Sequence, residues 1–315
     1  MTAILSRRRV GAAVFLLALD VTGCDQQSPE ANGGGDACRV AQPPTALDTR
    51  IPESSGAAIS RQQRGVIWTH NDSGAEAELF AVHTNGELAG TVTLEGARHQ
   101  DWEDIAVADC PLGSCLYVAD IGDNAGRRST VDIYRLREPE PGTRTPVPTE
   151  HFSVRYPDGP RDAEALFILP PERLFVVTRG RGDPIAVYAV PGPLRPDTTV
   201  ELEHVRTLST AAVPHDDQVT GADATADGRW IVLRTPSSLY FYTADQLLPS
   251  SRDTGRAGTP LEAGANPPIR AGLNGIGEVQ GEGVAAGDNG VVVLTSEGFG
   301  GMQGAITVLW CGMLK

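Results

Sequence analysis

Three carboxylates within four residues are the first group in this sequence whose types and spacing could do chemistry. They are Asp101, Glu103 and Asp104, in the stretch "HQDWEDIAV" at 99–107, and an apolar, strand-like tail follows them. Glutamates recur in similar settings at Glu164 and Glu282. Clustered carboxylate oxygens are the ligands that Ca²⁺ or Mg²⁺ prefers over soft metals. The pattern therefore makes a bound divalent cation one interpretation of the recurring glutamates Glu103, Glu164 and Glu282.

The acidic unit belongs to a repeat. Successive units lie roughly 50–60 residues apart, which is the range of propeller blades. They read ESSGAAI at 53–59, WEDIAV at 102–107, AEALFI at 163–168, TGADA at 220–224 and GEGVA at 281–285.

Each unit is followed by further β-rich runs. Second runs are expected at 65–69, 115–119, 174–178, 230–234 and 291–295, third runs at 78–82, 131–134, 185–188, 239–242 and 305–309, and fourth runs at 90–94, 152–156 and 202–206. Asn-Gly and Asp-Gly pairs at 85–86, 227–228 and 289–290 favour tight hairpins, because these residues tolerate positive φ. Five four-stranded antiparallel units predict an all-β fold, a five-bladed β-propeller. Six blades would need a degenerate unit at 245–275, but the Pro, Gly and Ser there are more typical of a long insertion.

The last unit lacks an outer strand, and the segment 45–51 near the N-terminus is expected to supply it and close the ring. Cys38 would then lie beside Cys311, where a disulfide would hold the closure. Cys110 and Cys115 bracket a tight turn and are expected to pair with each other. The rival interpretation of these two as zinc ligands lacks neighbouring Cys or His.

In a propeller the innermost strands line the central channel, so Glu103, Glu164 and Glu282 should converge at one axial mouth. The second strands end at the same mouth and add further acidic candidates for a metal site. These are Asp72, Asp120 and Asp123. The alternative is structural, because carboxylates at the start of inner strands can accept hydrogen bonds from loop N–H groups or bridge neighbouring blades. Both interpretations stay open at this stage, together with a catalytic carboxylate.

The units "ESSGAA", "DWEDIA", "DAEALF" and "GEGVAA" resemble the blade motifs of the bacterial SdiA-regulated propellers. They are also similar to those of esterase-like phytase and gluconolactonase-type propellers, and the resemblance runs over most of residues 45–310. In the gluconolactonase type, the glutamate of the Glu-Gly motif binds a divalent metal in the axial channel. The resemblance implies this role for Glu282, with Glu103 and Glu164 as counterparts. The fourth unit departs from the pattern, because Gly221 stands where the glutamate would be.

The N-terminal residues resemble a bacterial lipoprotein signal. Arg7–Arg9 form a basic region, residues 10–19 a short apolar run, and Val21–Cys24 a lipobox-like ending. We therefore expect residues 1–23 to be a signal peptide, Cys24 to carry lipid, 24–37 to be a flexible tether and 38–315 to be a single propeller domain. Export by the twin-arginine or the general route stays open. The expected location is the outer face of a bacterial membrane, and ordinary secretion is the alternative.

The chain has 40 acidic against 26 basic residues, so nucleic acid is excluded as an expected partner. Two functions remain. One is a non-catalytic, extracytoplasmic binding protein, whose ligand is an envelope protein or a small anion at Arg127–Arg128, Arg179 or Arg234. The other is a metal-assisted hydrolase of a phosphate ester or lactone. Whether the chain is an enzyme is left undecided, because no nucleophile motif is recognisable and His70 and His99 are only candidate acids or bases.

Overall fold

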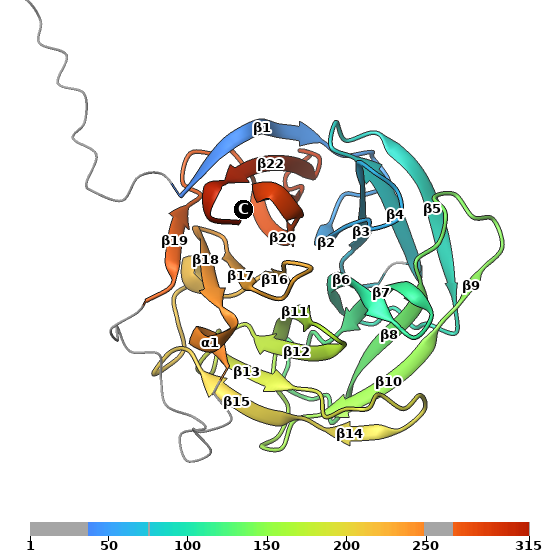
Figure 1. The fold of residues 1–315 in the computed structure, drawn as a ribbon, viewed down its shortest axis with the longest axis vertical. Helices are drawn as coiled ribbons and strands as arrows, with labels where there is room; N and C mark the ends of the chain where they lie inside the picture. The colour runs from blue at the N-terminus through green and yellow to red at the C-terminus, as the bar shows by residue number, and fades with distance from the viewer. Residues whose placement is uncertain (1–36, 75, 249–266, 315) are drawn as a thin grey trace, which may run out of the picture. The chain divides into compact units, whose positions relative to one another are not determined.

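Alternating apolar residues bounded by Gly-rich turns fold into five antiparallel sheets in the computed structural model, which describes residues 37–74, 76–248 and 267–314. The sheets are arranged around a common centre, with one strand of each facing that centre (Figure 1). The five inner strands are β2 (Ser54–Ile59), β6 (Trp102–Cys110), β11 (Ala163–Leu169), β16 (Gly221–Ala224) and β20 (Gln280–Ala286). Each packs against the inner strands of the two neighbouring sheets, so the ring is closed. The predicted five-bladed propeller is confirmed.

The second strand of each blade hydrogen-bonds to the inner strand, and the third strand to the second. The second strands are β3 (Val66–Asn71), β7 (Gly113–Asp120), β12 (Arg173–Thr178), β17 (Trp230–Thr235) and β21 (Val291–Glu297). The third strands are β4 (Glu78–His83), β8 (Val131–Arg137), β13 (Ala186–Ala189), β18 (Ser238–Thr243) and β22 (Ala305–Cys311). The hydrophobic core lies between the faces of adjacent blades, for example where Trp68 of blade one meets Ile105 and Leu116 of blade two.

The structure contains more outer strands than the sequence analysis predicted. The fourth strands of blades one to four are β5 (Leu88–Glu95), β10 (Glu150–Arg155), β15 (Glu203–Thr207) and β19 (Ile269–Gly272). β19 lies in the segment that we expected to be insertion only, and the short helix α1 (Ala244–Leu247) precedes it. Two short strands, β9 (Val147–Pro148) and β14 (Thr199–Glu201), add parallel to β5 and β10.

The ring closes through β1 (Cys38–Ala46), which pairs antiparallel with β22. The predicted closure by an N-terminal strand is confirmed, but this strand begins before the segment 45–51 that we predicted and overlaps it only at residues 45 and 46. Pro43 and Pro44 obscured it, because proline seldom occurs inside a strand; here β1 is an edge strand, and its register shifts around the two prolines. Cys38 lies opposite Cys311, and a disulfide joins them.

The second predicted disulfide, Cys110–Cys115, spans the β6–β7 turn. Two disulfides in one chain indicate an oxidising, extracytoplasmic compartment. None of the helices in the described part of the chain has the length and apolar character that crossing a bilayer requires. The expected signal peptide, Cys24 and the tether up to residue 36 lie outside the described residues.

Candidate functional site

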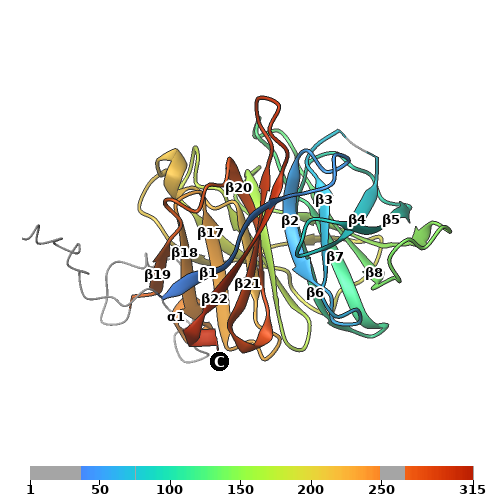
Figure 2. The ribbon, with the colours of Figure 1, turned by 90° about the horizontal axis from the view of Figure 1, so that it is seen from above.

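The order of strands within each blade brings acidic residues to one end of the central channel, which we call the acidic mouth. The inner strands begin at the mouth where the second strands end, as the register of β6 with β7 shows by placing Trp102 opposite Asp120. Glu103 and Glu164 occupy β-bulges, because the ladder skips one residue between Trp102 and Asp104 and again between Ala163 and Ala165. A bulge bends the strand and re-aims the side chain of the extra residue. Figure 2 shows this mouth from the side, with the β21–β22 hairpin rising above it.

Three carboxylates of blades one and two meet at the mouth. One oxygen each of Asp72, Asp101 and Glu103 lies within 4.8 Å of the others, which is close enough for all three to contact one cation. Asp72 follows β3, whereas Asp101 and Glu103 flank the start of β6. We call these three residues the carboxylate triad. Asp72 and Glu103 were predicted as metal candidates; Asp101 was not, although it stands in the same short acidic stretch.

Burial governs the electrostatics of the triad. Glu103 is 5% exposed, and burial, followed by the charge of Glu164, raises the pKa of its carboxyl well above the usual range. Burial and the neighbouring charge of Asp72 raise the pKa of Asp101 to about 6. Burial also raises the pKa of Asp72, whose Oδ1 is buried and has no hydrogen-bond partner. Like charges that converge without a compensating cation favour protonation, and a bound cation would reverse this preference.

The backbone of Gly122 closes one side of the triad. A Cβ atom at this position would lie 2.1 Å from Glu103 Oε1 and 2.5 Å from Asp101 Oδ2. Any side chain larger than glycine would therefore occupy the space in which the two carboxylates face each other.

Glu164 connects the triad to blade three. Its charge contributes to the raised pKa of Glu103, and Arg179 Nη1 donates a hydrogen bond to its Oε1. Burial raises the pKa of Glu164 to about 8, and the charge of Glu282 adds to the effect, against the opposing influence of Arg179.

Asp120 and Asp123, two further predicted candidates, already accept hydrogen bonds from protein groups. Asp120 receives the backbone N–H groups of residues 100 and 101 at 3.2 Å and Arg128 Nη1 at 2.7 Å. Asp123 receives the N–H groups of residues 127 and 128 at 2.9 and 2.7 Å. Asp120 therefore holds the backbone of Asp101 in position, and Asp123 orders the loop that carries Arg128.

Glu282, the last predicted candidate, lies on the blade-five side of the mouth, where Gln280 Nε2 donates to it at 2.9 Å. Blade four contributes no glutamate here, and the structure explains why. A Cβ atom on Gly221 would lie 2.7 Å from the carbonyl oxygen of Glu282 in the next blade. Packing therefore requires glycine at this position, and this is why the fourth unit departs from the sequence pattern.

The sequence left open that carboxylates bridge neighbouring blades through hydrogen bonds. Two other carboxylates, those of Asp104 and Asp223, have this role. Asp104 Oδ2 accepts the N–H groups of Leu166 at 2.9 Å and Ala222 at 3.1 Å, in blades three and four. Asp223 Oδ2 accepts the N–H of Ala286 in blade five at 2.8 Å. These aspartates connect four blades around the axis.

The two histidines near the mouth differ in their surroundings. His70 is fully buried, and burial lowers its pKa to about 4, so its ring is neutral at physiological pH. His99 stacks on Trp102 with 4.1 Å between ring centroids, and its Nδ1 contacts the carbonyl oxygen of Glu76 at 2.9 Å. Its Nε2 is buried and has no hydrogen-bond partner.

Three of the four arginines that suggested an anion site are paired with carboxylates, and the fourth, Arg127, is exposed. Arg128 pairs with Asp120 at 2.7 Å and Arg179 with Glu164. Arg234 is fully buried and donates to Glu278 at 2.5 Å and to the carbonyl oxygens of Gly283 and Thr295.

No family model matches this chain, and no curated protein matches it in sequence. Among solved structures, it is similar to the PQQ-bound form of an aldose sugar dehydrogenase from Streptomyces coelicolor, with 13% identity, a TM-score of 0.49, and coverage of 87% of this chain and 97% of that one. A putative oxidoreductase (glucose dehydrogenase) from Thermus thermophilus has 9% identity and a TM-score of 0.43, over 86% and 99% of the two chains. Both TM-scores are below 0.5, so neither likeness bears on the function of this chain.

Proposed function

We propose that this protein is an extracytoplasmic binding protein that holds a divalent cation at the axial mouth of its propeller. The observation that carries the proposal is the carboxylate triad. One oxygen of each residue lies within 4.8 Å of the others, and Glu103, almost fully buried, lies among the like charges of Asp72, Asp101 and Glu164.

The chemistry of the triad favours Ca²⁺. All three candidate ligands are carboxylate oxygens, and Ca²⁺ accepts six to eight oxygen ligands in flexible geometry. The partnerless Oδ1 of Asp72 has a lone pair available for a cation. Asp72, Asp101 and Glu103 would hold the ion, and the nearby charge of Glu164 would add to the attraction. The bound ion would supply positive charge that attracts an oxygen of a ligand at the mouth.

Calcium binding to the folded protein tests the proposal. We expect isothermal titration calorimetry to detect one Ca²⁺ site in EDTA-treated, dialysed protein, and Asp101→Asn to weaken it at least ~10-fold. At a hundredfold excess over Kd, binding should stabilise the fold by about 2.7 kcal/mol, a rise in Tm of a few degrees. Glu164→Gln should reduce this rise.

Asp197→Asn is the matched control, because Asp197 is exposed and has a φ of 59°, which asparagine also tolerates. Equal Ca²⁺ affinity in wild type and Asp101→Asn, or no binding by wild type, would overturn the cation site.

The proposed attachment of the protein to a membrane rests on the sequence before residue 37. A lipid on Cys24 would anchor the protein to the membrane, since several acyl chains hold firmly where one is marginal. Cys24→Ser should move the protein from the membrane to the soluble fraction. A soluble wild type would contradict the anchor and leave the cation site unaffected.

One observation favours metal-assisted hydrolysis as a second candidate function. His99 Nε2 is buried without a partner, and the imidazole lies near enough to Asp72 to lower the pKa of that carboxyl against the larger effect of burial. A divalent cation would supply an activated water, and His99 could hold the proton. Hydrolysis of phosphate-ester or lactone substrates that requires Ca²⁺ and is lost in His99→Ala would support this function; no turnover with either class of substrate would exclude it.

A further inference from the structure

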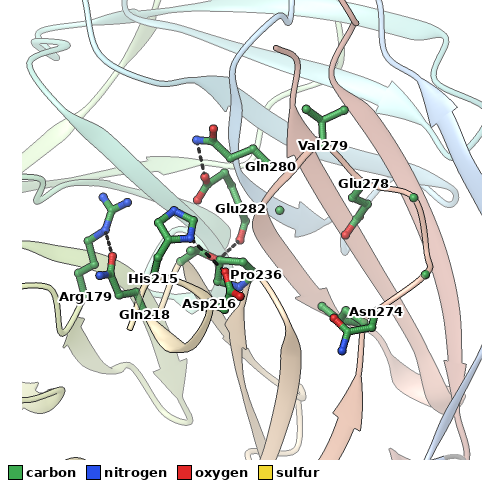
Figure 3. Close-up of a pocket in the computed structure, with 15 residues that line it drawn as sticks. Arg179, His215, Asp216, Gln218, Pro236, Asn274, Glu278, Val279, Gln280 and Glu282 are labelled. Atoms are coloured by element: carbon green, nitrogen blue, oxygen red, sulfur yellow. Dashed lines mark hydrogen bonds and ion pairs between the residues drawn. The ribbon is translucent and has the colours of Figure 1, made fainter. Parts of the chain in front are cut away.

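A polar cavity of about 420 Å³ opens between blades four and five at the same mouth. Figure 3 shows its side chains, which include the amides of Gln218, Asn274 and Gln280 and the carboxylate of Glu282. Small-molecule sites of this volume are common in proteins. The cavity lies on the blade-five side of the mouth, and none of the triad residues lines it.

Two carboxylates beside this cavity lack a cationic partner. Glu282 is 6% exposed and Glu297 is half-buried, and no Arg, Lys or His nitrogen of the described residues lies within 4 Å of either. The nearby arginines are already engaged, because Arg179 pairs with Glu164 and Arg234 with Glu278.

The amide of Gln280 stands between these two carboxylates. Its Nε2 donates to Glu282 Oε1 at 2.9 Å and to Glu297 Oε2 at 2.7 Å. A neutral amide thus occupies the position in which a cation would be best placed. Charge-assisted hydrogen bonds are roughly twice as strong as neutral ones, so a guanidinium or ammonium group could replace the amide with a gain in binding.

We propose that this cavity binds a guanidinium or ammonium group on a flexible chain, with Glu282 and Glu297 as its anionic partners and Gln280 as the group that it displaces. The inference deepens the proposed binding function by assigning a ligand class to the mouth, and it does not require the cation of the triad.

Exposed apolar side chains at this end of blade five suit the rest of such a ligand. Val279 is 40% exposed, and Phe299 and Met302, at 71% and 58%, lie in the β21–β22 loop that follows Glu297 directly. Because Gln280 lies opposite Glu297 in the β20–β21 ladder, Val279 and this loop are on the same side of the mouth. The aliphatic stem of an arginine or lysine, or of a small amine, could cover these apolar groups while its charged end enters the cavity.

Matched amides test the charge requirement. Nα-acetyl-arginine amide and Nα-acetyl-lysine amide should bind EDTA-treated protein in ligand-observed NMR titrations. Nα-acetyl-citrulline amide, which keeps the shape of arginine without its charge, should bind at least ~10-fold more weakly, a difference of about 1.4 kcal/mol. Equal binding of the arginine and citrulline compounds, or no binding of either cation, would overturn the proposal.

Substitutions then locate the site. Combined Glu282→Gln and Glu297→Gln should abolish arginine-amide binding, Gln280→Ala should strengthen it, and Gln280→Lys should block it by placing a cation of the protein in the site. Binding that survives Gln280→Lys would overturn the assignment. If the double variant fails to fold, arginine-amide binding by the single variants Glu297→Gln and Gln280→Lys tests the site instead.

Two further experiments distinguish this site from the triad and identify whether the bound guanidinium or ammonium group comes from a protein or from a small amine. Asp101→Asn should keep arginine-amide binding while losing Ca²⁺, so either site can fail without the other. An acetyl-Leu-Arg-Leu amide that binds more tightly than the single residue, and loses this gain in Phe299→Ser, would identify a protein side chain as the ligand. Equal affinity of the two would identify a small amine. Either outcome requires the cation site.

Discussion

Asp104 Oδ2 in β6 accepts the backbone N–H of Ala222 in β16 at 3.1 Å, across 118 residues of sequence. The same oxygen accepts the N–H of Leu166 at 2.9 Å, and Oδ1 accepts that of Ile105. One carboxylate therefore ties three blades together at the centre of the ring, where each donor would otherwise be buried without a partner.

Asp104→Asn should destabilise the protein by about 2–3 kcal/mol in urea unfolding, because the asparagine NH₂ group would face a backbone donor. Asp109→Asn provides a control on the same strand, since Asp109 is exposed and should change stability by less than about 0.5 kcal/mol. Equal stabilities of the two variants would show that Asp104 does not bridge the blades.

Stability should fall as pH rises from about 5 to 8 in EDTA-containing buffer. Burial raises the pKa of Asp101 to about 6, of Asp223 to about 7, and of Glu164 and Glu297 to about 8. The folded state therefore holds more protons than the unfolded state between the unfolded values near 4 and pH 8, and the free energy of unfolding decreases across this window.

Urea unfolding at pH 5 and pH 8 measures the effect, and Glu297→Gln should reduce the difference because it removes one of these groups. A free energy of unfolding that rises with pH would show that these four carboxylates are ionised in the folded state. Added Ca²⁺ should restore stability at pH 8 more than at pH 5.

Removing the Cys38–Cys311 disulfide should destabilise the ring more than removing Cys110–Cys115. The two cysteines are separated by 273 residues in one case and by 5 in the other. The loop-entropy model gives an upper limit of about 5–6 kcal/mol for the first and about 2 kcal/mol for the second. Paired Cys→Ser variants and urea unfolding test the order, and non-reducing peptide mapping tests the pairing. A Cys38–Cys110 peptide would contradict closure through β1.

Gly221→Ala should destabilise blade four by about 1–3 kcal/mol, because its Cβ would lie 2.7 Å from the carbonyl oxygen of Glu282. Gly182→Ala is the control, since no heavy atom lies within 4 Å of a Cβ at that position. An unchanged Tm in Gly221→Ala would show that the absence of a side chain in blade four is not required by packing.

The sequence by itself determined the five repeats, the order of strands within each blade and both disulfide pairings. The repeats, the strand order and the Cys110–Cys115 pairing rest on local information, namely alternation of apolar residues, Asn-Gly and Asp-Gly turns, and the spacing of recurring units. The Cys38–Cys311 pairing follows from the closure that a ring of such units requires. The closing strand was placed too late in the sequence, because the prolines of β1 hide an edge strand whose pairing depends on β22, at the other end of the chain.

Tertiary structure alone decides which carboxylate bridges blades and which faces other carboxylates. Asp104 stands beside Glu103 and has the same chemistry, yet Asp104 bridges blades whereas Glu103 faces Asp72 and Asp101. The β-bulge at Glu103 directs the two neighbouring side chains to different surroundings. Likewise, the amide of Gln280 lies between Glu282 and Glu297 only because β20 and β21 pair in that register. Whether a carboxylate meets a backbone N–H, a second carboxylate or an amide depends on strands that are distant in sequence, and local pattern carries no information about them.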